Sequence, residues 1–418
     1  MAGRKFMSAS FFALAAVLTA GSLFSQVNRK IGVRFSFWTV FDDNAFRNYQ
    51  MLSDVVYQPD AVLYYSRQTD RSGFQMDYEG SLALFQNYMN RRFQHHFLGL
   101  NGDRQLDDSG SVAFYWGLRG GRRWNEPDYA YYNYTTASGY MNVRFDKGQT
   151  GSVGLGFSGQ TQKFKDLAQF NFYEIRTYLQ PTLYLPTRTT LIGQFQLGHK
   201  KFTEPVVNQE VIQRTITLVW NGRGWIRGTG NPNRSKQDSI RFYTIERLVT
   251  VTSPGKSVLQ FTALGRVAQS VFSGTGIAFQ GVIRRNPKQD GRFLSFQDSG
   301  YEQEDVLFDD PYSYASDELS FEWTQLLPWN LNLKAGWDWK HKRYGYPAYD
   351  AEGNPLAGTS RKDRRENLWL TLKKAIRLKG FSPQPVLYFS YSCLNNHSND
   401  AYYDYTNRVS SVGLNFGF

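Results

Sequence analysis

The last ten residues, Val409–Phe418, constrain the fold most, because apolar side chains occupy every second position. Val412, Leu414, Phe416 and Phe418 alternate with glycine or asparagine. Successive side chains on a β-strand point to opposite faces, so this pattern predicts a strand with one apolar face. Chain ends usually fray, so we expect a strand patterned up to its last residue to be held in a sheet.

The same period of two recurs along the chain. Runs of this kind occupy residues 31–37, 74–84, 112–118, 153–157, 173–183, 191–197, 319–324 and 331–340. In each run one series of residues is almost free of charge, whereas the other carries polar or charged side chains. A helix would scatter these apolar residues around its surface. The sequence therefore predicts an all-β chain of many antiparallel strands.

Alternation alone does not distinguish a soluble β-sandwich from a transmembrane barrel. The terminal segment, however, resembles the closing strand of bacterial outer-membrane β-barrel proteins of the porin-like kind. The resemblance implies that Val412, Leu414, Phe416 and Phe418 form a signal for the barrel-assembly machinery. It also implies that the wall contacts outer-membrane lipid and lipopolysaccharide. In such a barrel the last strand pairs with the first, near Ile31–Phe37, which removes both sheet edges.

The beginning of the chain has the layout of a secretory signal peptide. Arg4 and Lys5 precede the apolar stretch Phe11–Thr19, and small residues follow at Ala20–Ser22. The apolar stretch is shorter than the roughly 20 residues of a membrane-spanning helix. We predict a cleaved signal peptide over residues 1–26 and one barrel domain over 27–418, with no room for a plug before the first strand.

The connections alternate in length. The short ones are predicted at 146–149, 185–188 and 327–330, and the longer ones at 119–128, 203–210, 284–314, 344–364 and 394–407. Short periplasmic turns and longer extracellular loops are typical of a transmembrane meander barrel. About 22 residues per strand and connection predict 18 strands, with 16 as the alternative. Segments 284–314 and 344–364 are long enough to fold into the lumen or to reach external partners.

The chain is basic, with a formal net charge of +12. The charged residues predicted to face the lumen are Arg34, Asp77, Glu79, Arg144, Glu174, Arg176, Arg266, Glu322, Lys334, Asp338 and Lys340. One hypothesis is weak anion selectivity, because an excess of lumen cations concentrates anions. The alternative is that these charges pair across the lumen while the surplus lies in loops. Export and the absence of a basic cluster argue against nucleic acid as a partner.

A barrel of 16–18 strands without a plug encloses an aqueous channel. The sequence therefore predicts a pore for passive or selective diffusion of small solutes, with no cofactor and no enzymatic activity. Two alternatives remain: a barrel enzyme acting on lipid, and a structural or adhesin-like surface barrel. Oligomeric state has no signal in the sequence.

The enzyme alternative depends on His397–Asp400, which vaguely resembles the His, Ser and Asn residues of outer-membrane phospholipases and lipid A deacylases. His397 and Ser398 are adjacent, so in a regular strand they would point to opposite faces. A nucleophile and its base must meet within hydrogen-bond distance. We therefore interpret this segment as a polar loop.

Two further groups of residues carry side chains that can bind metal ions. An acidic loop could hold Ca²⁺ with its carboxylates, but its spacing matches no calcium-binding motif, so a solvated acidic surface is favoured. Its members are Glu302, Glu304, Asp305, Asp309 and Asp310. The adjacent pair His95-His96 diverges in a strand and is a poor metal site. The single Cys393 excludes an intramolecular disulfide and falls on a predicted lipid-facing position.

Overall fold

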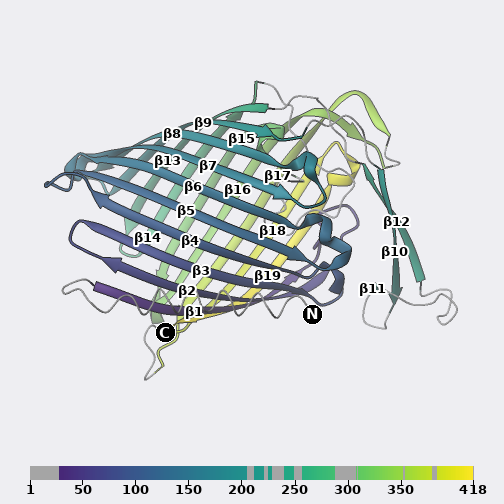
Figure 1. Ribbon diagram of the computed structural model, residues 1–418, viewed down its shortest axis with the longest axis horizontal. Coiled ribbons are helices and arrows are strands. Elements are labelled where there is room, and N and C mark those ends of the chain that lie inside the picture. The colour runs from purple at the N-terminus through teal and green to yellow at the C-terminus, as the bar shows by residue number, and fades with distance from the viewer. Residues whose placement is uncertain are drawn as a thin grey trace.

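The computed structural model describes residues 28–204, 211–220, 225–227, 240–248, 257–287, 307, 309–351, 354–378 and 384–417. Sixteen antiparallel strands within these residues close into a barrel (Figure 1). Each strand pairs with its neighbours in chain order, and the first pairs with the last. The predicted all-β meander barrel is confirmed, and sixteen, the alternative count, is the number of barrel strands in the described part.

The barrel strands are β1 (Asn28–Asp42), β2 (Asp54–Gln68), β3 (Ser72–Phe85), β4 (Phe93–Gln105), β5 (Val112–Asn125), β6 (Tyr134–Asp146), β7 (Gly151–Phe164), β8 (Phe172–Leu185), β9 (Thr189–Phe202), β13 (Ser257–Phe272), β14 (Thr275–Arg285), β15 (Tyr314–Leu327), β16 (Leu331–Tyr349), β17 (Pro355–Ala375), β18 (Val386–Ser398) and β19 (Tyr405–Gly417). Short 3-10 turns are η1 (Met89–Arg91), η2 (Pro127–Tyr132), η3 (Gly148–Thr150), η4 (Ala168–Phe170), η8 (Pro311–Ser313), η9 (Pro328–Asn330) and η10 (Ala401–Tyr403). Over the described ranges, no helix has the length and apolarity required to cross a membrane.

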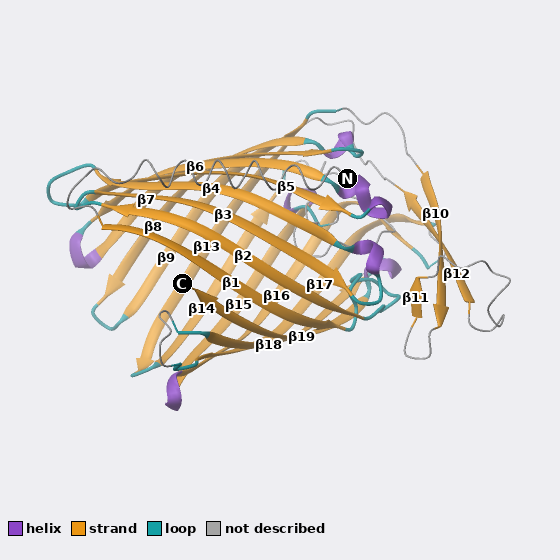
Figure 2. Cartoon of the chain, turned by 60° about the horizontal axis from the view of Figure 1, so that its bottom comes forward, coloured by secondary structure: helices purple, strands orange, loops and turns teal. Residues whose placement is uncertain are grey.

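The predicted count of eighteen strands is wrong because of one insertion between β9 and β13. It contains β10 (Val211–Trp220), β11 (Trp225–Arg227) and β12 (Ile240–Leu248), which form a separate three-stranded sheet. This sheet extends beyond one end of the barrel in both views (Figures 1 and 2). A uniform spacing per strand therefore assigned to the wall a segment that does not belong to it.

The barrel closes between the first and last strands, as the resemblance implied. Phe35 of β1 is paired with Phe416 of β19, and their ring centroids lie 5.7 Å apart. Gly413 is needed at this seam, because a Cβ there would lie 2.4 Å from the Trp38 ring. The missing side chain lets the indole lie flat against β19. Phe418 lies outside the described residues.

The two ends of the barrel differ. The predicted short connections at 146–149, 185–188 and 327–330 all lie at one end, here called the turn end, and the opposite end is the loop end. At the loop end several strands extend into predicted loops, among them β17, which begins at Pro355, because polar strand residues there resemble loop sequence. β5 reaches Asn125, β16 reaches Tyr349 and β18 reaches Ser398. Most helical turns, purple in Figure 2, gather at this end.

The outer wall is apolar and the inner wall is polar. Residues paired directly across strands share a face, so the strand register assigns each side chain to one wall. Large apolar side chains on the outer series are exposed, among them Ile31 (60%), Leu319 (52%) and Leu368 (60%). Hydrocarbon chains solvate such a surface, and a closed barrel leaves no unpaired edge in lipid. The chain therefore forms a transmembrane barrel.

Candidate functional site

The lumen is the candidate functional site, because charged side chains converge there. The register places the sequence-predicted charges on the inner series: Arg34 is opposite Val62, which is opposite Glu79, and the alternation continues around the wall. Eight of the eleven take part in ion pairs within 4.0 Å, the exceptions among described residues being Arg34, Asp77 and Asp338.

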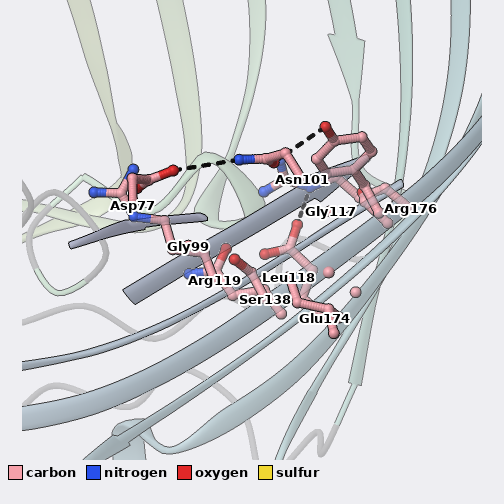
Figure 3. A pocket seen from close by; sticks show the side chains of 14 residues that line it. Asp77, Gly99, Asn101, Gly117, Leu118, Arg119, Ser138, Glu174 and Arg176 are labelled. Atoms are coloured by element: carbon pink, nitrogen blue, oxygen red, sulfur yellow. Dashed lines mark hydrogen bonds and ion pairs between the residues drawn. The ribbon is translucent and has the colours of Figure 1, made fainter. Parts of the chain in front are cut away.

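The inner series of the wall formed by β3–β8 carries at least as many acids as bases. It contains a concavity of about 400 Å³, lined by the residues labelled in Figure 3. Arg119 binds Glu79 at 2.6 Å, and Arg176 forms a close ion pair with Glu174. Asp77 faces the same space, where the Asn101 amide lies 3.5 Å from its carboxylate. This wall therefore has no cation excess.

On the wall formed by β13–β16, each of two glutamates is approached by two cations, and Asp338 is a third carboxylate of the same inner series. Arg266 and Lys334 approach Glu322 at 3.9 and 3.4 Å. On the same wall Glu318 lies 2.8 Å from Arg284 and 3.3 Å from Lys340. The two walls therefore differ in charge, which makes a potential difference across the lumen.

The loop end of the lumen is narrowed by a segment of the β14–β15 connection, residues 309–313, here called the mouth segment. The Asp310 carboxylate binds the Lys200 ammonium of β9 at 2.6 Å, and each side chain is only 2% exposed. The same carboxylate accepts the Tyr312 backbone N–H at 3.1 Å and so caps η8. The Lys200 ammonium also lies 3.9 Å from the centre of the Phe172 ring. Carboxylate and ring together offset the desolvation of a buried cation.

Tyr312 extends this anchor to β8. Its hydroxyl donates to Glu174 at 2.7 Å, so the mouth segment and Arg176 share one carboxylate. Gly198 of β9 makes the approach possible, because a Cβ there would lie 2.4 Å from the Tyr312 hydroxyl.

Asp309 anchors the mouth segment to another part of the wall. It forms a close ion pair with Lys342 of β16 and accepts from the Tyr344 hydroxyl at 2.9 Å, while Arg365 of β17 lies at 3.8 Å. Burial raises the pKa of the Asp309 carboxyl, but the nearby cations, Lys342 first among them, outweigh it and hold that pKa well below its ordinary value. At Asp310 burial exceeds the effect of Lys200 and raises the pKa.

Aromatic side chains also pack at the loop end of the lumen, where they add to its narrowing. Leu307 is buried in a cluster with Tyr129, Tyr132 and Phe170, which belong to the connections after β5 and β7. Next to it, Tyr314, Tyr344 and Tyr346 pack together, and the buried Arg361 lies 4.3 Å above the Tyr344 ring. The expectation that segment 284–314 can fold into the lumen is thus met by its described part.

The histidine candidates, which lie within the described residues, are not arranged as a catalytic or metal site. His397 is 73% exposed and lies 3.7 Å from Asp404, whereas Ser398 donates to the inward-facing Asp363 at 2.7 Å. The two side chains therefore lie on opposite faces. His95 stacks on Phe93 inside the barrel, and His96 contacts the Tyr78 hydroxyl on the outer wall.

For the acidic loop, Glu302, Glu304 and Asp305 lie outside the described residues. Asp309 and Asp310 bind lysines, which overturns their interpretation as a solvated acidic surface. Cys393 faces outward opposite Leu368. In the closing strand, Val412 and Leu414 are exposed on the outer wall, and Phe416 packs on Phe35.

Sequence reasoning missed the residues that hold the mouth segment. Lys200 and Lys342 fall on the inward series, near strand ends that the sequence-predicted runs do not reach. Their inward position could have been found by extending the alternation to the strand ends. Their partners could not, because Asp309 and Asp310 lie in a connection with no period.

Comparison with known proteins gives one partial family match. Residues 285–418, from the last residue of β14 to the end, match the family described as surface lipoprotein assembly modifier. The matched part is less than half of the chain. No curated protein matches the chain.

Several solved barrels resemble the chain along its length. Acinetobacter baumannii OccAB1 has 9% identity and a TM-score of 0.49, with 93% of this chain and 96% of that chain covered. Pseudomonas aeruginosa OccK8 (OprE) has 10% identity and a TM-score of 0.46, with 94% and 98% covered. Pseudomonas aeruginosa OpdK has 8% identity and a TM-score of 0.47, with the same coverage.

Proposed function

We propose that this protein is an outer-membrane pore for passive or selective diffusion of small solutes, narrowed at its loop end by the mouth segment. The observation that carries the proposal is the contrast between the walls: charges of both signs line the lumen, while apolar side chains cover the exterior. Small hydrated solutes and water are the contents that such a lumen solvates. Membrane lipid, lipopolysaccharide and the barrel-assembly machinery are the partners this location implies.

Planar-bilayer recording tests the proposal. Purified protein should give discrete conductance steps, and Asp309→Asn/Asp310→Asn, which removes both ionic anchors of the mouth segment, should give larger ones. Arg144→Gln, which changes a lumen charge near the turn end, serves as the control. A barrel that inserts into the bilayer without any conductance would contradict a pore.

Weak anion selectivity is the proposed consequence of the cation-rich wall. Two glutamates there are each approached by two cations, whereas Glu79 and Glu174 on the facing wall each form an ion pair with one arginine. The pairing keeps the preference small, because paired charges produce a weaker field than free ones. Reversal potential in a salt gradient measures it.

A second candidate is a role in assembling surface lipoproteins, which is favoured by the family match of residues 285–418 alone. Loss of a lipoprotein from the cell surface after deletion of the gene, with restoration by the intact gene, would support it. An enzymatic role is disfavoured by the opposed His397 and Ser398. We therefore expect the protein to show no lipase or deacylase activity, and substitution of His397 should not change the result of either assay.

A further inference from the structure

The outer wall carries charged side chains at the loop end of β14–β17, directly beside the apolar band. Arg285, Asp317, Arg343, Lys362, Arg364 and Glu366 belong to the outward series of these four adjacent strands. The apolar surface resumes two residues away along the strands, at Ile283, Leu319 and Leu368, which are all more than half exposed. The charges therefore lie at the level where hydrocarbon gives way to lipid head groups.

The register gathers these side chains into one patch. Arg343 is directly opposite both Ala315 and Lys362, and Arg285 continues β14 one residue beyond the pair formed by Arg284 and Ser316. In the next row, Asp317 is opposite His341, which is opposite Arg364. Four cations and two carboxylates thus occupy neighbouring positions on four strands, an excess of two positive charges.

Asp317 holds two guanidinium groups side by side. Its two carboxylate oxygens accept from Arg285 at 2.6 Å and from Arg343 at 2.9 Å. Each guanidinium carries five N–H donors, so one carboxylate leaves donors on both arginines. Arg285 is further fixed by bonds to the carbonyls of Arg284 and Ser316, each at 2.9 Å. Fixed, adjacent guanidinium groups suit phosphate, which they bind through two parallel hydrogen bonds.

Glu366 fixes the third arginine in a similar way. It accepts from two nitrogens of Arg364 at 2.9 and 2.5 Å. These charges project from a wall whose neighbouring surface is apolar. A ligand that contacts both surfaces must therefore carry a phosphate group and a hydrocarbon chain. A free anion satisfies the first requirement only, whereas an anionic lipid satisfies both.

We propose that this patch, Arg285, Arg343, Lys362 and Arg364 with their positioning partners Asp317 and Glu366, binds the phosphate head group of an anionic lipid in the membrane leaflet at the loop end. The bound lipid lies along the outer wall, with its acyl chains on the apolar surface near Leu319 and Leu368. The proposal requires a transmembrane barrel and is independent of what crosses the lumen.

Native mass spectrometry of the full chain in a non-ionic detergent tests the proposal, with phosphatidylglycerol and phosphatidylcholine added at equal concentration. The protein should retain phosphatidylglycerol preferentially. Arg285→Gln/Arg343→Gln/Arg364→Gln should lower that preference about tenfold or more, because each cation near the head groups contributes to it. The single variant Arg343→Gln, which perturbs folding less, should lower it about fivefold.

A matched control removes as much charge elsewhere on the outer wall. Arg122, Lys163 and Lys201 face outward at the loop ends of β5, β7 and β9. Arg122→Gln/Lys163→Gln/Lys201→Gln should keep the preference within about twofold, since these cations are not gathered around a shared carboxylate. An equal loss of the phosphatidylglycerol preference in the control variant would overturn the proposal, because it would show that only the total positive charge of the outer wall matters. Displacement of the lipid by inorganic phosphate at equal concentration would overturn it in favour of a free-anion site.

Discussion

At the scale of single residues, the ion pair between Lys200 and Asp310 has the largest predicted effect. Both side chains are almost completely withdrawn from solvent. Burial of such a pair costs desolvation energy that only the partner and its hydrogen bonds recover. Removal of one partner therefore leaves a buried charge without compensation, which is more harmful than removal of both.

Lys200→Met should destabilise the mouth segment by about 3–5 kcal/mol and raise the conductance. Lys200→Met/Asp310→Leu should recover much of the stability, because neither charge remains buried. Thermal unfolding, followed by the mobility change of the heated barrel on gels, measures this. Lys201→Met is the control, since Lys201 faces outward. Equal destabilisation by both single variants would show that the pair does not act as described.

The ionisation of Asp309 should make the stability of the mouth segment, and with it the conductance, depend on pH. Its pKa is held below the ordinary value of 3.8, so the ionised carboxylate stabilises the folded mouth. This stability is fully present above the ordinary pKa and is lost as pH falls through the lowered one. Single-channel conductance should therefore be constant from pH 7 to about 5 and rise below about pH 4. Asp309→Asn should have the larger conductance already at pH 7, and an acid response unchanged in this variant would contradict the assignment.

At the scale of elements, we expect the closing strand β19 to serve assembly rather than transport. Its outward residues Val412, Leu414 and Phe416 face lipid and the seam with β1, and its inward residues are small or polar apart from Tyr405 and Val409. The resemblance to outer-membrane barrels rests on this strand. A change in the strand should therefore alter the amount of protein inserted in the membrane.

Deletion of Phe418 should reduce the amount of barrel in the outer membrane several-fold while leaving the selectivity of the inserted fraction unchanged. Quantitative immunoblots of membrane fractions and reversal potentials measure the two effects. Phe272→Ala removes an exposed aromatic side chain from β13 and controls for a general loss of lipid contact. Normal membrane levels of the shortened chain would refute the assembly role.

At the scale of the whole molecule, we expect the unequal charge of the two walls to set the ion preference. Arg266→Gln/Lys334→Gln removes two cations from the wall that has the excess, so the reversal potential should shift toward cations. Arg119→Gln/Glu79→Gln removes a balanced pair from the facing wall and should leave the reversal potential near that of the native protein. Cation preference in the native protein would end the anion hypothesis.

The sequence predicted the wall better than the mouth, for a physical reason. Alternation is imposed by lipid on one face and water on the other, so runs such as 74–84 and 331–340 identify strands and faces directly. The strands β10, β11 and β12 are not part of the barrel wall, so they lack this constraint, and the predicted strand count failed there. The partners of Asp309 and Asp310 depend on tertiary contacts across more than thirty residues of chain, which no local pattern records.

The mouth segment also has a mechanical consequence. Asp309 and Asp310 are adjacent in the chain, yet they are bound to β16 and β9, which are four strands apart around the wall. A thin-walled cylinder deforms most easily by becoming oval. A segment bound to two separate strands of the wall opposes that deformation, so the mouth segment stiffens the loop end of the barrel. The opening therefore cannot widen without a change in the shape of the barrel cross-section. By the same connection, lateral pressure from the bilayer acts on the entrance of the lumen.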